Sequence, residues 1–130
     1  MGAAIRDKIK QFYIDYFQLY PSVIIDDEGQ YHEDFWFFNI YKELYCLDYD
    51  KCIIDEYEPG VDDHDIEKYY LSDTILDAIP EEKRLIFRPK NTDMGYTFVH
   101  QKIADIFQAH GVDTLNLVKV PEWEAGKQFR

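Results

Sequence analysis

The chain has 130 residues, which is enough for one compact domain and too few for two ordinary ones. Because 46% of its residues are hydrophobic and 17% aromatic, it can bury enough apolar surface to offset the entropy lost on folding, which argues against a disordered chain. Its formal net charge of −12 argues against nucleic acid or an anionic membrane surface as the main partner, since both require clustered Lys and Arg.

The negative charge is concentrated in the middle of the chain. Residues 21–80 carry seventeen acidic and three basic side chains, whereas residues 1–20 and 81–130 each have a net charge of +1. The imbalance is therefore a property of one segment, and it directs the search for a binding surface to that segment.

Three features indicate where the protein acts. No stretch approaches the roughly 18–20 uncharged apolar residues that a transmembrane helix needs. Residues 1–10 contain scattered charges and no apolar run, so we expect no secretory signal and a cytoplasmic location. Cys46 and Cys52 are too few for the disulfide framework of a small secreted protein, and we interpret them as reduced, structural thiols.

The first predicted element is an amphipathic helix over residues 1–20. Apolar side chains, most of them aromatic or β-branched, recur at helical spacing from Ile5 to Tyr20, and Pro21 ends the pattern. The apolar stripe either faces the core or docks on a partner.

The central segment is expected to contain strands and acidic turns. A short apolar run is closed by an acidic turn at residues 26–29, and the aromatic run at residues 35–41 predicts a strand buried on both faces, at the centre of a sheet. Residues 44–54 are mixed and indicate strand or irregular structure. The most acidic stretch, residues 55–67, is broken by Pro-Gly and predicts an exposed loop. A strand at residues 68–71 follows it.

A short helix, a hairpin and a second helix are predicted next. Ser72 is the expected N-cap of a helix over residues 73–79. Strands at residues 84–88 and 96–99 flank turn residues and predict a hairpin. A helix over residues 100–110 then ends at a glycine suited to a left-handed cap.

A last strand is expected at residues 114–120, before a polar tail at residues 121–130. This order of elements is not a regular βαβ alternation. It predicts an α+β fold, a single domain over residues 1–130 with a mostly antiparallel or mixed sheet, an N-terminal amphipathic helix and a helix before the last strand.

The sequence offers no motif for catalysis or for a cofactor. The segment beginning Asp48-x-Asp50 starts like a calcium loop, but Ile53 stands where the loop requires glycine. Residues 62–65, Asp-Asp-His-Asp, hold metal-ligand types, yet adjacent residues rarely converge on one ion. There is no nucleophile elbow and no glycine-rich phosphate loop. We therefore expect no metal, no cofactor, no catalytic residue and no enzymatic activity.

The remaining unusual feature is an acidic belt interleaved with Tyr31, Tyr57, Tyr69 and Tyr70. Carboxylates around aromatic anchors suit a basic protein surface, because complementary charge speeds encounter and buried aromatics supply binding energy. The alternative is an ordinary solvated face that keeps the protein soluble. The candidate partner-binding residues are Asp26, Asp27, Glu28, Asp55, Glu56, Tyr57, Glu58, Asp62, Asp63 and Asp65.

Two segments give the chain a family resemblance. Residues 31–41 (Tyr-His-Glu-Asp-Phe-Trp-Phe-Phe-Asn-Ile-Tyr), followed by Cys-Leu-Asp-Tyr-Asp-Lys at residues 46–51, resemble bacterial polymorphic-toxin immunity proteins. In that family an aromatic Trp-x-x-Asn-Ile strand precedes a Leu-Asp element. The order of elements over residues 85–120 is similar too.

The resemblance implies a protein that binds and neutralises one cognate toxin, and it carries over no active site. Together with the absence of a signal peptide, it implies a toxin that acts in the cytoplasm, such as a nuclease, whose surface is commonly basic. Two rival classes stay open. One is a general acidic adaptor or nucleic-acid mimic that binds several basic proteins, and the other is a small hydrolase or metal protein.

Overall fold

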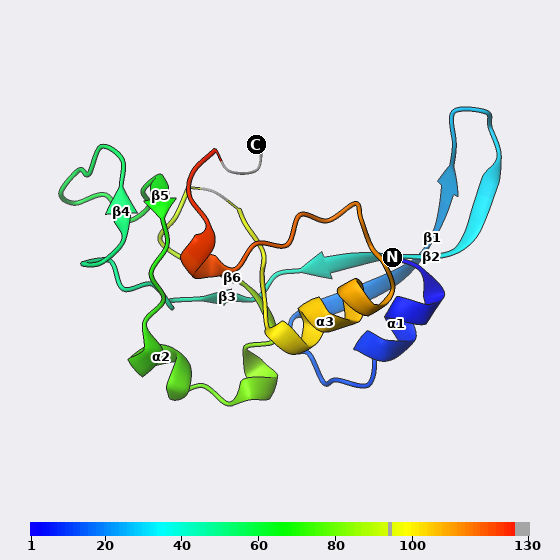
Figure 1. The fold of residues 1–130 in the computed structure, drawn as a ribbon, viewed down its shortest axis with the longest axis horizontal. Helices are drawn as coiled ribbons and strands as arrows, with labels where there is room; N and C mark the ends of the chain where they lie inside the picture. The colour runs from blue at the N-terminus through cyan, green and yellow to red at the C-terminus, as the bar shows by residue number, and fades with distance from the viewer. Residues whose placement is uncertain (94, 127–130) are drawn as a thin grey trace.

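The hydrophobic core lies where two helices and two strands meet. The computed structural model describes residues 1–93 and 95–126. Figure 1 shows helices α1 (Ala3–Ile9) and α3 (Gln101–Ala109) side by side, and α1 also contacts strand β2 (Tyr31–Ile40). Strand β6 (Ile86–Pro89) completes the contact. The buried residues of this cluster are Ile9, Ile40, Leu85, Ile86, Ile103 and Phe107.

The N-terminal helix is present, but it is shorter than predicted. Helix α1 ends at Ile9, and residues 17–25, expected to be helical in part, form strand β1 (Phe17–Ile25). Aromatic and β-branched side chains favour strands, and their spacing here fits an alternating pattern as well as a helical one. Tyr16, with a φ of 54°, separates the two elements, and Pro21 lies inside β1 instead of ending a helix.

The prediction of a doubly buried central strand at residues 35–41 was wrong. Strand β2 pairs with β1 in an antiparallel two-stranded sheet, and burial alternates from Trp36 to Ile40. Trp36 and Phe38 are half-buried, whereas Phe37 is 62% exposed. Aromatic residues occupy both odd and even positions of the run at residues 35–41, so they lie on both faces of β2. One of these faces covers the core, and the other remains in solvent.

Two further small sheets form the remainder of the fold. Strands β3 (Glu43–Leu44), β6 and β7 (Phe98–Val99) make a three-stranded sheet, in which β3 and β6 are parallel and β6 and β7 are antiparallel. Strands β4 (Ile53–Ile54) and β5 (Ile66–Lys68) pair antiparallel at the far end of the molecule. The short helices are α2 (Asp73–Asp77), η1 (Glu81–Lys83) and η2 (Val120–Glu122). The fold is α+β with mixed and antiparallel sheets, as predicted.

Local signals in the second half of the chain were confirmed. The Ser72 hydroxyl accepts a hydrogen bond from the Ile75 amide and caps α2. Strands β6 and β7 form the expected antiparallel pair. Helix α3 begins after His100 and is followed by Gly111, whose φ is 63°.

The predicted strand at residues 114–120 is not formed. This segment joins none of the three sheets, and Val120 already begins η2. Of the expected turn after β6 and of the polar tail, residues 94 and 127–130 lie outside the described part of the chain. None of the described helices is long and apolar enough to cross a membrane.

Candidate functional site

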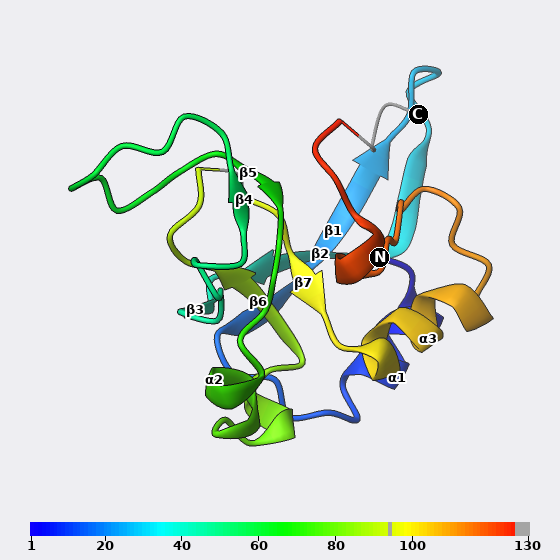
Figure 2. The same cartoon turned by 60° about the vertical axis from the view of Figure 1, so that its left-hand side comes forward.

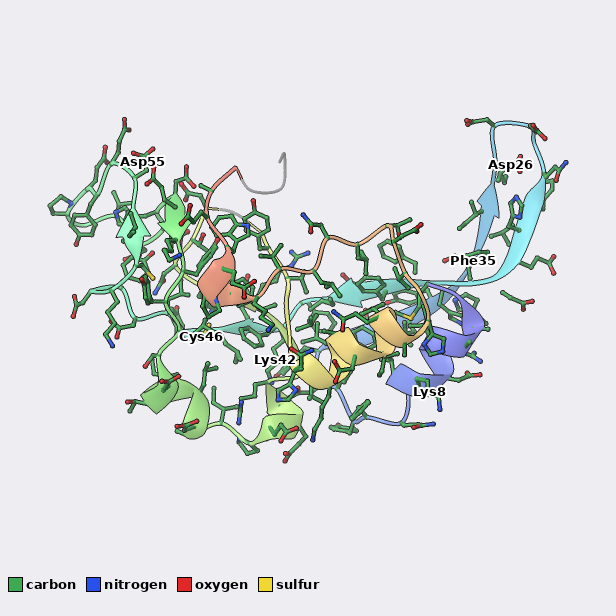
Figure 3. All side chains as sticks on the ribbon, viewed as in Figure 1. Lys8, Asp26, Phe35, Lys42, Cys46 and Asp55 are labelled. Atoms are coloured by element: carbon green, nitrogen blue, oxygen red, sulfur yellow. The ribbon has the colours of Figure 1, made fainter. Side chains whose placement is uncertain are left out.

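The predicted contact residues form two separate groups. The first, the hairpin tip, is Asp26, Asp27 and Glu28 in the turn between β1 and β2. The second, the acidic loop, is residues 55–65 between β4 and β5. Figure 3 places Asp26 and Asp55 at opposite ends of the long axis, so the two groups do not form one continuous belt. In Figures 1 and 2, however, the hairpin and the loop both rise on the same side of the body, as two acidic arms.

In the hairpin tip, Asp26 serves the turn itself. Its Oδ1 accepts hydrogen bonds from the backbone amides of Glu28 (3.0 Å) and Gln30 (2.9 Å), and its Oδ2 lies 2.8 Å from Nε2 of His32. The hydrogen bond with His32, followed by those from the backbone, lowers the pKa of Asp26. The carboxylates of this turn left for a partner are therefore those of Asp27 and Glu28, both on exposed residues.

The acidic loop presents six carboxylates at the surface. Its six acidic residues are all exposed, and none forms an ion pair with another described residue. They are Asp55, Glu56, Glu58, Asp62, Asp63 and Asp65. The backbone amide of Asp55 donates to the carbonyl of Asp65 (3.0 Å), which closes the loop at its base.

The three basic side chains of residues 21–80 form ion pairs with acids outside the hairpin tip and the acidic loop. Nζ of Lys42, a buried residue, lies 2.9 and 2.8 Å from the two carboxylate oxygens of Asp15. Lys51 pairs with Asp48, and Lys68 pairs with Glu124, each at 3.7 Å. The charge of the two arms is thus left uncompensated by the bases nearest to them in sequence.

A buried histidine, which we did not predict as a site residue, holds the acidic loop in shape. The residue His64 is 4% exposed, and its Nε2 lies 3.2 Å from the amide nitrogen and 3.1 Å from the carbonyl oxygen of Glu58. Its ring stacks on Tyr57 with centroids 4.8 Å apart, while Tyr49 approaches at 6.0 Å in a T-shaped arrangement. The Asp93 amide donates to its backbone carbonyl (3.0 Å). The only sequence signal was a histidine among acids, which does not distinguish a packing role from a surface one.

The tyrosines of the predicted belt have different roles. Tyr57 and Tyr31 are exposed, at 62% and 72%, and Tyr70 is exposed as well. Tyr69, in contrast, is buried among Tyr96, Phe98 and Trp123, so it is a core residue and not a surface anchor. Tyr57 is exposed and fixed against His64 at the same time, which suits an anchor whose conformational entropy is already reduced.

Other places for chemistry are limited in the described residues. A cavity of about 710 Å³ lies between β7, α3 and the segment at residues 116–123, and it contains none of the predicted site residues. No group of three or more His, Cys, Asp or Glu residues is arranged to hold a metal ion within residues 1–93 and 95–126. Cys46 and Cys52 are both free thiols, and burial raises the pKa of Cys46 to about 12, so this thiol is poorly suited to act as a nucleophile.

Comparison of the chain with known protein families, with characterised proteins and with solved structures finds no match. The resemblance to toxin-immunity proteins therefore rests on the two sequence segments quoted above and on the order of elements over residues 85–120, of which the last expected strand is not formed.

Proposed function

We propose that this protein binds and neutralises a cognate bacterial toxin that acts in the cytoplasm, such as a nuclease, by stoichiometric protein–protein binding through its acidic surface. The family resemblance suggests the class of partner. The observation that carries the proposal is the acidic loop, whose six exposed carboxylates have no ion-pair partner among the described residues.

The electrostatics favour a basic partner. Like charges crowded in one loop repel one another, and a surface rich in Lys and Arg relieves that repulsion on contact. At physiological salt the Debye length is about 8 Å, so neighbouring carboxylates in the loop act together on an approaching protein. Such complementarity mainly accelerates association.

The position of the arms favours a large partner. Because the hairpin and the loop rise on the same side from opposite ends of the body, a protein seated between them contacts both (Figure 2). Two contacts on one rigid partner make dissociation slower than either contact would alone. An ordinary solvated face gives no reason for the loop to be fixed around a buried histidine.

The test is the association rate with the product of the neighbouring reading frame, which we expect to contain the cognate toxin domain. The variant Asp62→Lys, Asp63→Lys, Asp65→Lys changes the acidic loop. A matched control, Asp77→Lys, Glu82→Lys, Asp113→Lys, changes three exposed acids outside the two arms. Each triple variant raises the formal net charge from −12 to −6, because every substitution adds two charges.

The loop variant is expected to associate at least about tenfold more slowly at low salt, while the control changes less than about threefold. Circular dichroism should be native for both. Equal slowing in the two variants would show that bulk charge, and not the loop, drives binding. A wild-type protein that binds lysozyme and cytochrome c as tightly as the toxin domain would be a general acidic adaptor instead.

A further inference from the structure

The β1–β2 hairpin exposes an unusual amount of apolar surface as it leaves the body. Six large side chains on it are each between about one half and three quarters exposed. Side chains of this size leave on the order of 600 Å² uncovered at such exposures, summed over the two faces of the hairpin. We call them the hairpin patch: Tyr20, Val23, Ile24, Ile25, Tyr31 and Phe37.

Cross-strand pairing places the apolar side chains of the patch on both faces of the hairpin, because side chains alternate along β1 and Tyr20 and Ile25 are an odd number of residues apart. Tyr20 is directly opposite Phe37, and Ile25 is directly opposite Tyr31, so the members of each pair share a face. A register irregularity between Ser22 and Ile24 separates the two pairs. Apolar groups are thus available from the middle of the hairpin to its turn.

The hairpin offers its faces for recognition more readily than its edges. Pro21 in β1 has no amide hydrogen to donate to a further strand. On β2, Met1 covers the edge, because the Trp36 amide donates to its carbonyl (2.8 Å) and its ammonium group donates to the Trp36 carbonyl (3.1 Å). Asp34, with a φ of 64°, interrupts the regular strand just beyond this contact.

The charged residues around the hairpin patch indicate what kind of partner binds there. Residues 22–34 contain five acidic side chains and neither Lys nor Arg. A second copy of a chain with a net charge of −12 is repelled, and so is an anionic membrane. A basic protein fits, with apolar side chains in its groove and Lys or Arg at the rim.

We propose that the hairpin inserts its apolar faces into a groove of a basic partner protein and controls the dissociation rate of the complex, whereas the acidic loop controls its association rate. This inference rests on the proposed function and adds the position of the anchor. Exposed aromatic side chains that become buried in a partner are the usual hot spots of interfaces.

The test measures dissociation of the toxin domain that we expect the neighbouring reading frame to encode. The hairpin variant is Tyr31→Ser, Phe37→Ser, and the matched control is Tyr13→Ser, Tyr45→Ser, which removes two exposed tyrosines outside the hairpin. The hairpin variant should dissociate at least about 30-fold faster with little change in association rate, and the control less than about threefold faster.

A second measurement leaves the hairpin's apolar character intact. A chain with benzoylphenylalanine in place of Tyr31 should cross-link to the same toxin domain on irradiation, and one with it in place of Tyr13 should not. Unchanged dissociation of the hairpin variant, or no cross-link from position 31, overturns the inference and leaves the proposed function standing.

Failure of the wild-type chain to bind the toxin domain overturns both proposals. Light scattering of the free protein identifies the competing occupant. A dimer that becomes a monomer in the hairpin variant would show that a second copy covers the patch, and it would also overturn the inference.

Discussion

The substitution His64→Ala tests whether this buried ring sets the shape of the acidic loop. The change removes the stack on Tyr57 and the hydrogen bond with the backbone of Glu58. Ring stacking contributes about 0.5–1.5 kcal/mol, and a hydrogen bond to the backbone contributes about as much. We therefore expect the loop to be destabilised by about 1–3 kcal/mol, because the ring is buried and its contacts have no substitute.

Native-state hydrogen exchange gives the measurement, since it resolves local opening from global unfolding. The amides of Asp55 and Glu58 should exchange roughly 5- to 150-fold faster in the variant, which is the same free-energy range expressed as an equilibrium. His110→Ala is the control, because that side chain is exposed and its hydrogen bond is with the Ile106 carbonyl of the adjacent helix α3. Unaltered exchange at Asp55 and Glu58 in His64→Ala would refute the assigned role of the ring.

Four further outcomes follow from the described contacts. Asp15→Asn should lower the free energy of unfolding by about 3 kcal/mol, because it leaves the buried Lys42 ammonium without its counter-charge, and urea titration measures this. Ile103→Ala, at a fully buried core position, should cost about 2–5 kcal/mol in the same assay. Folding lowers the pKa of Asp26, so the ionised carboxylate stabilises the folded state. This stabilisation is present above the unfolded pKa of about 3.9 and is lost as the pH falls through the lower pKa of the folded state. The amide signals of the hairpin turn should therefore shift on acidification below about pH 4. Thiol labelling at pH 8 should leave Cys46 unmodified in the folded protein, since its pKa is about 12, and rapid labelling would contradict its burial.

The parts of the fold that were predictable depend on local signals. Ser72 caps a helix, Gly111 follows one, and strands β6 and β7 form the antiparallel pair that their sequence predicts. Helix α3 was predicted within one residue at each end, because its apolar positions repeat at helical spacing between clear stop signals.

The first forty residues show why the rest could not be predicted. Their aromatic and β-branched side chains fit a helical period and a strand period equally well, and only pairing with β2 settles the choice for β1. The aromatic run of β2 suggested burial on both faces, but the described chain supplies a partner for one face only.

The sequence predicted which residues of the candidate site are acidic and exposed, but it did not predict how they are arranged in space. The exposure of the acids followed from their chemistry. Their division between two ends of the molecule depends on tertiary contacts far apart in sequence, such as the hydrogen bond from the Asp93 amide to the His64 carbonyl. For the same reason the sequence did not distinguish the core position of Tyr69 or the packing role of His64 from a surface position.

The central claim is that the protein neutralises a toxin by stoichiometric binding. It is tested most directly by titrating the activity of the toxin domain that we expect the neighbouring reading frame to encode with the purified protein, at toxin concentrations far above the dissociation constant. We expect the activity to fall linearly and to reach zero at one equivalent. Full activity at an excess of the protein would contradict the claim, and so would complete inactivation by a small fraction of an equivalent, which would indicate catalysis instead of binding.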